Sequence, residues 1–387
     1  MEGVGMDSDD PWSVTDRNLH DRLRSLRETD ATAAVATVVG VEGSAYRRPG
    51  AKLLAPADDD ALGAITAGCL EGPVAELAAD ARQTGAAAVE TFDLMDEDEW
   101  GLGLGCNGII DVLVEPLDDS YDPLLDALAE REPATVLTVV ESDDEAVPVG
   151  ARSVLTAEGF RTGDDRPGLP DDALDDLRDA AADARESGSS GGVTVEREAG
   201  DLLVFVDGVE PAPDLLLFGA QNDVHAVARF GAEAGFRVTV ASARGARADE
   251  DAFPHAHRVV GTHPDDIGDA VEAPERTYAV LMSHNLIDDQ LALEELLRET
   301  DVPYVGLMGP RERFEEIRDA AAAEGATFTP EELDRVSTPV GLDLGDGSPT
   351  GIALSVVAEA LAVANDAEGG RLREQSGPIH PRTDPTP

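Results

Sequence analysis

Apolar and polar positions alternate in a regular rhythm along the second half of the chain. Short apolar runs of buried-strand length occur at residues 215–218, 237–241, 278–283 and 302–308. Amphipathic stretches of helical length lie between or after them, at about residues 223–235, 288–300, 311–325 and 350–364. Strands that alternate with helices are typical of a parallel sheet covered on both faces. The pattern therefore predicts a Rossmann-like, doubly wound α/β domain over residues 211–365.

The first half of the chain is less regular. Helical patterns occur at about residues 15–28, 71–84, 123–131 and 171–186. Apolar and β-branched runs predict strands at residues 31–41, 51–56, 89–94, 109–115, 134–140, 150–155, 192–196 and 202–206. This mixture indicates an α+β domain over residues 16–210. The pattern fixes no topology for it, and no internal repeat is evident.

Pro211 and Pro213 stiffen an extended connection and predict the boundary between the two domains. Residues 1–15 and 366–387 are polar and lack periodicity, so we expect both tails to be unstructured. The first ten residues are acidic, and no run of 18 apolar residues occurs, so neither a secretory signal nor a membrane-spanning helix is expected.

Composition adds a strong acidic bias. The 387 residues include 29 Lys and Arg against 80 Asp and Glu, which gives a formal net charge of −51. Such a surface repels phosphate backbones and anionic lipids, so no nucleic-acid or membrane partner is expected. Molar salt reduces the screening length to about 3 Å and suppresses the self-repulsion. We therefore interpret the composition as an adaptation to a halophilic cytoplasm.

Long acid-free segments are informative in so acidic a chain. Residues 43–57 contain no carboxylate but include Arg47, Arg48 and Lys52. Residues 61–70 and 100–110 carry no charge and contain several glycines. Glycine-rich loops let the backbone approach a ligand, and arginine offers forked donors to phosphate. The combination predicts a pocket for an anionic cofactor, although ordinary turns and salt bridges would produce some of the same features.

The two cysteines both lie in such segments. Cys69 belongs to A-G-C-L-E-G, directly before the helix predicted from Glu71, and a helix N-terminus stabilises a thiolate. Cys106 belongs to G-L-G-L-G-C-N-G and precedes a predicted strand. The absence of C-x-x-C and of histidine from both motifs disfavours a structural zinc site. Thiolates suit a soft or redox-active metal, and inert buried cysteines are the alternative.

The motifs together resemble the xanthine dehydrogenase accessory family of XdhC/CoxI type, over nearly all of residues 33–364. They are E-G-S-A-Y-R-R-P-G-A-K at 42–52, A-G-C-L-E-G at 67–72, G-L-G-C-N-G-I-I-D-V-L-V-E-P at 103–116, L-L-L-F-G-A at 215–220, L-M-S-H-N at 281–285, Y-V-G-L-M-G-P-R at 304–311 and P-V-G-L-D-L-G at 339–345. The acidic composition makes the chain similar to a halophilic archaeal member of that family.

This resemblance implies a cytoplasmic protein that binds the molybdenum cofactor, as molybdopterin or its dinucleotide form. Such a protein holds the cofactor during sulfuration by a cysteine desulfurase-type donor and delivers it to the large subunit of a molybdenum hydroxylase of the xanthine or CO dehydrogenase type. It would be a maturation factor, and a homodimer is compatible with this role. Cys69 is implied as the thiolate that holds the cofactor or relays sulfur, with molybdenum as the metal it meets.

Further residues are candidates for the cofactor site. In the first domain they are Arg47, Arg48 and Lys52 for phosphate, with Gly68, Glu71, Gly105 and Cys106 around the thiol loops. In the second domain they are Gly219, Asn222, Asp223, Arg244 and Arg311. His284 follows a predicted strand near Asp288 and is a candidate acid–base group or ligand, with a structural hydrogen bond as the alternative. Asp343 is a candidate for ordering its loop or binding a cation.

The second domain departs from a dinucleotide-binding pattern. The segment from Gly219 to Asp223 has Gln221 where a glycine would let pyrophosphate approach. Ser242 stands where an acid would hold the ribose, and Arg244 would favour NADP over NAD. We predict against tight NAD(P) binding. An NAD(P)-dependent oxidoreductase with His284 as proton donor is the alternative function, and a non-catalytic module bridging the hydroxylase to its sulfur donor is a third.

Overall fold

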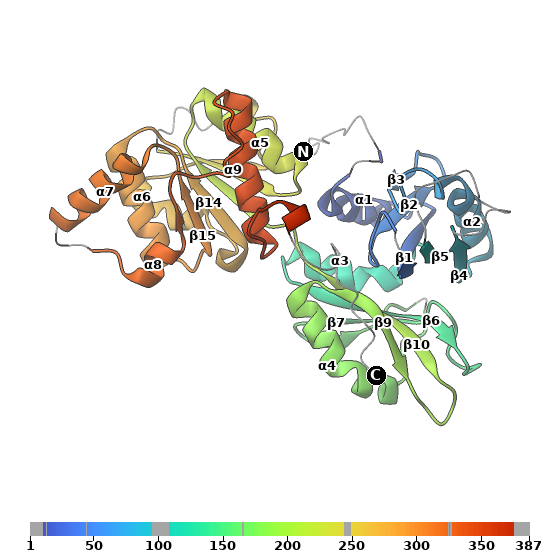
Figure 1. Ribbon diagram of the computed structural model, residues 1–387. Helices are drawn as coiled ribbons and strands as arrows, with labels where there is room; N and C mark the ends of the chain where they lie inside the picture. Colours follow the sequence, from blue (N-terminus) through green and yellow to red (C-terminus); the bar gives the residue numbers. More distant parts are fainter. Residues whose placement is uncertain are drawn as a thin grey trace. The chain divides into compact units, whose positions relative to one another are not determined.

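The computed structural model describes residues 11–12, 14–43, 45–94, 108–164, 166–243, 249–323, 325 and 327–374. The chain forms two compact units that divide between Pro211 and Ala212. Figure 1 shows antiparallel sheets with flanking helices in the first unit, and a sheet with helices on both faces in the second.

The first unit begins with a lobe built on one five-stranded antiparallel sheet, which we call lobe 1. Its elements are α1 (Asp16–Glu28), β1 (Ala33–Gly43), β2 (Lys52–Pro56), β3 (Leu62–Gly63), α2 (Glu71–Thr84), β4 (Ala88–Asp93) and β5 (Gly108–Pro116). The strand order is β3-β2-β1-β5-β4. Helix α2 packs Val74, Ala78 and Ala81 against one face of this sheet, so its small apolar stripe lies close to the strands.

Lobe 2 follows with a second antiparallel sheet. Its elements are α3 (Asp122–Ala129), β6 (Ala134–Ser142), β7 (Arg152–Thr156), β8 (Gly159–Arg161), α4 (Asp171–Ser187), β9 (Ser190–Val195) and β10 (Leu202–Val209). The strand order is β8-β7-β6-β10-β9. Helix α4 covers this sheet with Ala173, Leu177, Ala181 and Ala184, at the i, i+4 spacing of a helix that buries one face.

The two lobes have the same architecture, which the sequence pattern did not reveal. Each consists of a helix, three strands, a helix and two strands, and the two sheets have equivalent strand orders. Backbone hydrogen bonds repeat as well: Val38 N–H donates to Ala51 at 2.9 Å, and Val139 N–H donates to Ala151 at 3.0 Å. The expectation of no internal repeat was therefore wrong. The faint signals are V-A-T-V-V and G-A-K in lobe 1, and V-L-T-V-V and G-A-R in lobe 2.

Equivalent ion pairs cross between the lobes. Lys52 of lobe 1 meets Asp207 of lobe 2 at 2.5 Å, and Arg152 of lobe 2 meets Glu115 of lobe 1. Lys52 and Arg152 occupy the same position opposite Thr37 and Thr138 of the central strands. Each lobe therefore supplies the cation of one pair and the carboxylate of the other, and the pairs join the lobes at buried positions.

The second unit is a six-stranded, fully parallel sheet in the order β13-β12-β11-β14-β15-β16. Its strands are β11 (Asp214–Phe218), β12 (Arg237–Ser242), β13 (Arg258–Gly261), β14 (Thr277–Leu281), β15 (Tyr304–Leu307) and β16 (Val336–Ser337). Its α-helices are α5 (Asn222–Glu233), α6 (Leu286–Glu299), α7 (Arg311–Ala323), α8 (Pro330–Asp334) and α9 (Pro349–Ala364).

Helices α5 and α9 pack on one face of this sheet, and α6 and α7 pack on the other. The predicted doubly wound Rossmann-like fold is therefore confirmed. The strand order reverses between β11 and β14, and ligands of such folds bind at the carboxyl ends of the strands near that point. The sequence missed the short edge strands β3, β8, β13 and β16, because each is too short or too exposed to carry a recognisable pattern.

The ends of the described chain hold some structure in segments expected to be tails. The carbonyl of Pro11 accepts a hydrogen bond from Gly63 of β3 at 2.9 Å, and Leu372–Glu374 form a short 3-10 turn. Residues 1–10 and 375–387 lie outside the described residues. Within the described parts of the chain, no helix combines the length and the apolar character that crossing a membrane requires.

Candidate functional site

Cys69 lies in the loop of residues 64–70 between β3 and α2, here called the Cys69 loop. Its side chain is partly exposed and touches the apolar core of lobe 1 from the edge. The neighbouring Gly68 has a φ of +110°, and a side chain at that position would meet no atom within 4 Å. The apex of the loop is therefore open to an incoming ligand, and glycine provides the left-handed backbone that places it there.

Glu71, the first residue of α2, holds this loop in shape. Its carboxylate accepts hydrogen bonds from the Thr66 N–H at 3.0 Å, the Thr66 hydroxyl at 2.7 Å and the Leu70 N–H at 3.1 Å. The Thr66 Oγ1 in turn accepts from the Cys69 N–H at 3.2 Å. Glu71 was predicted in the cofactor site. These contacts give it a positioning role, since its carboxylate oxygens accept hydrogen bonds from the loop that carries the thiol.

An aromatic pair borders the same loop. The Trp12 Nε1–H donates to the Thr66 carbonyl at 3.3 Å, and the Trp12 and Tyr46 rings lie 5.9 Å apart at an interplanar angle of 33°. Both rings are exposed, at 39 % and 56 %. The sequence reasoning missed these two residues, although Tyr46 stands directly before the predicted cations.

The three cations predicted to bind phosphate differ in their surroundings. Lys52 lies on β2, and its Nζ bonds to Asp207 at 2.5 Å and to the Gly50 carbonyl at 3.0 Å, with its side chain 11 % exposed. This ammonium is already matched by a carboxylate in the contact between the lobes, so Lys52 is less available to a phosphate than an unpaired cation would be. Arg47 is partly exposed and Arg48 is exposed, in the loop that carries Tyr46.

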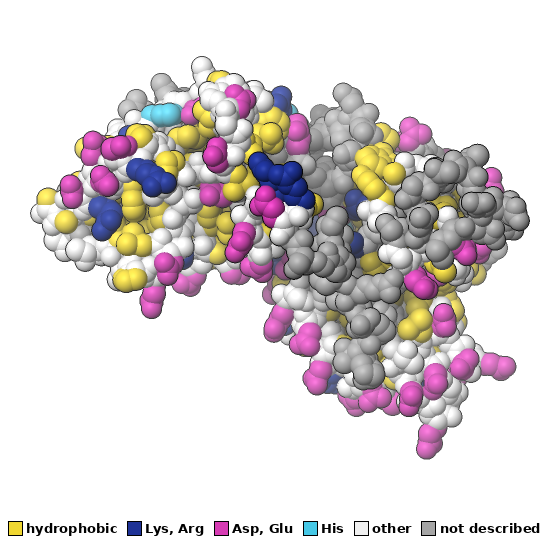
Figure 2. Space-filling view, in the orientation of Figure 1, with side chains coloured by type: hydrophobic (Ala, Val, Ile, Leu, Met, Phe, Trp, Pro, Cys, Tyr) yellow, Lys and Arg dark blue, Asp and Glu magenta, His cyan; other side chains and the backbone are white. Residues whose placement is uncertain are grey.

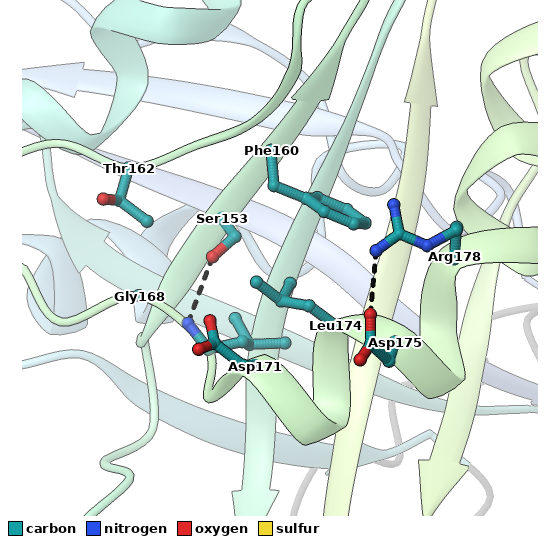
Figure 3. Close-up of a pocket in the computed structure, with 9 residues that line it drawn as sticks. Ser153, Phe160, Thr162, Gly168, Asp171, Leu174, Asp175 and Arg178 are labelled. Atoms are coloured by element: carbon teal, nitrogen blue, oxygen red, sulfur yellow. Dashed lines mark hydrogen bonds and ion pairs between the residues drawn. The ribbon is translucent and has the colours of Figure 1, made fainter.

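Lobe 2 has a pocket at the equivalent place, where β7, β8 and the start of α4 meet (Figure 3). The pocket has a volume of about 620 Å³. Asp171 begins α4 as Glu71 begins α2, but Leu169 stands where Cys69 would be. Ser153 Oγ accepts from the Leu169 N–H at 3.1 Å, and Arg178 is paired with Asp175 at 2.8 Å. The described residues that line this pocket thus offer no thiol and no unmatched cation, and the two lobes differ in chemistry.

In the second unit the turn before α5 is filled by its own side chain. Gln221 Oε1 accepts from the Ala220 N–H at 3.0 Å, and its Nε2 donates to the Ser283 carbonyl at 2.8 Å. The backbone of Gly219 is also closely packed, because a Cβ at this position would lie 2.6 Å from the Met282 carbonyl oxygen. The amide of Gln221 therefore ties the turn to the end of β14, where a dinucleotide phosphate would approach.

His284 lies across the point where the strand order reverses. Its Nε2 is 2.7 Å from Asp223 Oδ2 at the start of α5, rather than beside Asp288 as expected. Its backbone has a φ of +60°, an uncommon conformation for a residue with a side chain. The Asp288 N–H is instead bonded to the Asn285 side chain that caps α6. The structure therefore brings His284 and Asp223 together as a partly exposed pair.

The remaining predicted residues are scattered. Asn222 is exposed at the start of α5, Arg311 is exposed at the start of α7, and Asp343 lies in an exposed loop. Ser242 is buried at the end of β12. Gly105, Cys106 and Arg244 lie outside the described residues. Among the described residues, no cluster of three His, Cys, Asp or Glu side chains has an arrangement that would bind a metal ion.

Comparison with known proteins supplies independent evidence. Residues 26–93 match the model of the XdhC and CoxI family, and residues 215–360 match that of the XdhC Rossmann domain. The chain is 28 % identical over 352 residues to a protein of Bacillus subtilis described as a probable xanthine dehydrogenase subunit, and the match covers 89 % of this chain and 97 % of that protein.

Two further similarities extend this result. A solved xanthine dehydrogenase structure from Bacillus halodurans superposes with a TM-score of 0.72 at 25 % identity, covering 91 % of this chain and 96 % of that one. The uncharacterised protein YqeB of Escherichia coli is 30 % identical over 186 residues, covering 46 % of this chain and 32 % of that protein. The similarity to the Bacillus proteins thus spans both units.

Proposed function

Because this chain belongs to the XdhC and CoxI family, we propose that it is an accessory protein of a molybdenum hydroxylase, which binds the molybdenum cofactor and delivers it to the large subunit. The xanthine dehydrogenase-associated relatives support the accessory role. The finer proposal is that the Cys69 loop holds the cofactor while a cysteine desulfurase-type donor supplies the terminal sulfur.

The observation that carries this proposal is the presentation of Cys69. The sulfur belongs to a partly exposed residue beside Gly68, where no neighbouring atom blocks the approach. The backbone of the loop is fixed through Thr66 and Glu71 before any ligand arrives. A preorganised and accessible cysteine sulfur suits a soft metal centre such as molybdenum carried on sulfur ligands.

The chain's own residues divide the work in this proposal. Cys69 holds the cargo through its sulfur, and Glu71 and Thr66 keep the sulfur at the loop apex. Arg47 and Arg48 offer guanidinium donors to the phosphate in a segment without carboxylates. Lys52 takes no part, since it binds Asp207. The cargo brings the dithiolene-bound molybdenum on which the hydroxylase later depends.

A transfer experiment tests the proposal. Cofactor-loaded protein, prepared in high salt, is mixed with a hydroxylase large subunit that lacks its cofactor, and the recovered hydroxylase activity is measured. We expect recovery with the wild type and loss of most of it with Cys69→Ala. Equal recovery with both proteins would contradict the role of Cys69. Capture of the hydroxylase by the cofactor-free chain as strongly as by the loaded chain would support a bridging module instead.

The alternative of an NAD(P)-dependent oxidoreductase is disfavoured by Gln221. Its side chain makes two hydrogen bonds across the turn that a dinucleotide would need, so a nucleotide would have to break both. His284 and Asp223 would still allow proton transfer there. A titration followed by NADPH fluorescence decides between these functions. We expect no saturable binding, and tight binding would restore the alternative.

A further inference from the structure

Trp12 and Tyr46 form an exposed aromatic surface in a chain that has few aromatic residues. Aromatic residues make up 4 % of the sequence, yet these two rings lie together with 39 % and 56 % of their surface exposed. Large aromatic side chains gain most when covered, through apolar burial and through stacking geometry. An exposed pair of rings is therefore suited to stacking against a planar group from outside the chain.

Two hydrogen bonds hold the Trp12 segment beside β3 and the Cys69 loop. The Gly63 N–H donates to the Pro11 carbonyl at 2.9 Å, so the segment before α1 lies along the edge strand β3. The indole N–H of Trp12 donates a hydrogen bond to the carbonyl of Thr66. The hydroxyl oxygen of the same residue accepts a hydrogen bond from the Cys69 N–H. The indole is thus attached to the residue that orders the thiol.

Tyr46 lies in the loop between β1 and β2, with its ring 5.9 Å from the ring of Trp12. Its neighbour Ala45 packs, together with Cys69, against one apolar cluster of lobe 1. Arg47 and Arg48 follow Tyr46 directly in a segment that contains no acid. The two rings, the guanidinium groups and the thiol therefore come from three segments of lobe 1: the one before α1, the loop between β1 and β2, and the Cys69 loop. The chain as a whole carries a net charge of −51. This combination suits an anionic aromatic ligand, because the rings can stack on its aromatic part and the guanidinium groups can pair with its negative charge.

We propose that Trp12 and Tyr46 are the stacking surface for the planar pterin of the molybdenum cofactor. This inference rests on the proposed function and names the part of the cofactor that each group contacts. The pyrimidine ring of a pterin is flat and conjugated, so it stacks on an aromatic face as a nucleobase does, an interaction of about 1–3 kcal/mol per ring. The arginines would then meet the phosphate, and Cys69 the metal end.

The test uses pterin-6-carboxylate, a planar anionic pterin without metal, and measures its affinity for the full chain by calorimetry in molar KCl. We expect Tyr46→Ala and Trp12→Ala each to weaken binding by about tenfold, the factor that corresponds to 1.4 kcal/mol. Tyr46→Phe should bind like the wild type because the ring remains. Phe314→Ala is the matched control, since Phe314 is a partly exposed ring beside Arg318 in the second unit.

A second readout separates stacking from a change of fold. In a Trp100→Phe background, Trp12 is the single tryptophan of the chain, and bound pterin should quench its fluorescence. No pterin binding by the wild type, or unchanged affinity in Tyr46→Ala, would overturn the stacking surface.

Molybdenum retention is measured separately. If retention is lost in Cys69→Ser but unchanged in Tyr46→Ala, the proposed function holds and the stacking surface does not. Pterin stacking without any molybdenum retention would mean that the proposed function fails.

Discussion

Glu71 and Gln221 each fold back onto the turn before a helix, with opposite consequences. Glu71 bonds along the base of the Cys69 loop and leaves the apex at Gly68 open. Gln221 bonds across its turn to Ser283 and closes it. Both side chains satisfy backbone groups at a helix start. One turn therefore presents a thiol, and the other is tied shut.

Removing the Glu71 carboxylate should loosen the Cys69 loop. We expect Glu71→Ala to lower the free energy of unfolding by about 2 kcal/mol, because the hydroxyl and the N–H of the buried Thr66 both lose their acceptor. Urea unfolding at fixed salt measures the change. Glu76→Ala, on the exposed side of the same helix, is the matched control. A Glu71→Ala protein as stable as Glu76→Ala would refute the positioning role.

His20 predicts a particular dependence of stability on pH. Burial, reinforced by the nearby Lys52 charge, lowers the pKa of His20 from 6.5 to about 4. Between these two pH values, the unfolded chain protonates His20 while the folded chain keeps it neutral. The contribution of the neutral imidazole to the free energy of unfolding is therefore complete above pH 6.5 and decreases as the pH falls towards 4, by up to about 3 kcal/mol.

The measurement for His20 is the midpoint of chemical unfolding between pH 7 and pH 5. The wild type should lose stability over this range, and His20→Gln should lose less, since it has no imidazole to titrate. Parallel curves for the two proteins would show that the His20 pKa is not depressed.

At the scale of elements, the first unit is a duplicated lobe joined by reciprocal ion pairs. Gly50 and Gly150 occupy equivalent turns, and a side chain at either would collide with the other lobe, with Ser190 in one case and Ala87 in the other. The lobes therefore approach closely on both sides of the ion pairs. This contact uses Lys52, while the Cys69 loop of lobe 1 remains open.

The Lys52–Asp207 pair should contribute to the joining of the lobes. Lys52→Met leaves the carboxylate of Asp207 buried, with Ser190 Oγ as a remaining partner at 2.7 Å, so we expect a loss of about 3 kcal/mol. Adding Asp207→Leu should recover part of it. Arg22→Met is the matched control, because its pair with Asp59 is exposed and is worth less than about 1 kcal/mol. Strictly additive losses in a double-mutant cycle would exclude the coupling.

The sequence predicted most elements but not their symmetry. Helix α2 was expected at residues 71–84 and is found at Glu71–Thr84, because its apolar spacing and flanking glycines are local signals. The lobe repeat was invisible, since few residues other than V-x-T-V-V and G-A-K/R are shared. The ion pair between Lys52 and Asp207 was not predicted, because the two residues lie 155 positions apart in the sequence. The Trp12–Tyr46 contact also depends on tertiary structure, which no local pattern reports.

At the scale of the whole molecule, the main feature is the excess of acidic side chains. Acidic side chains are spread over the visible face of both units (Figure 2), in keeping with the net charge of −51. Repulsion of this size opposes compaction until salt screens it. Residues 43–57 and 61–70, which contain Arg47, Arg48 and Cys69, carry no carboxylate of their own. Local repulsion of an anionic cargo by these two segments is therefore low.

Stability should therefore rise steeply with salt. We expect the thermal unfolding midpoint, followed by circular dichroism, to increase between about 0.1 M and molar KCl, since the screening length falls from about 10 Å to about 3 Å over that range. Sodium sulfate at equal ionic strength separates screening from the specific effects of the ions. An unchanged midpoint from low to high KCl would contradict adaptation to high salt.

The central claim, that the Cys69 loop holds a molybdenum cofactor, is tested most directly by metal content. The wild type, Cys69→Ser and Glu76→Ala are isolated in high salt from cells that make the cofactor, and molybdenum and pterin per chain are measured. The account predicts near-stoichiometric molybdenum in the wild type and in Glu76→Ala, and almost none in Cys69→Ser. Equal molybdenum in all three proteins, or none in the wild type, would contradict it.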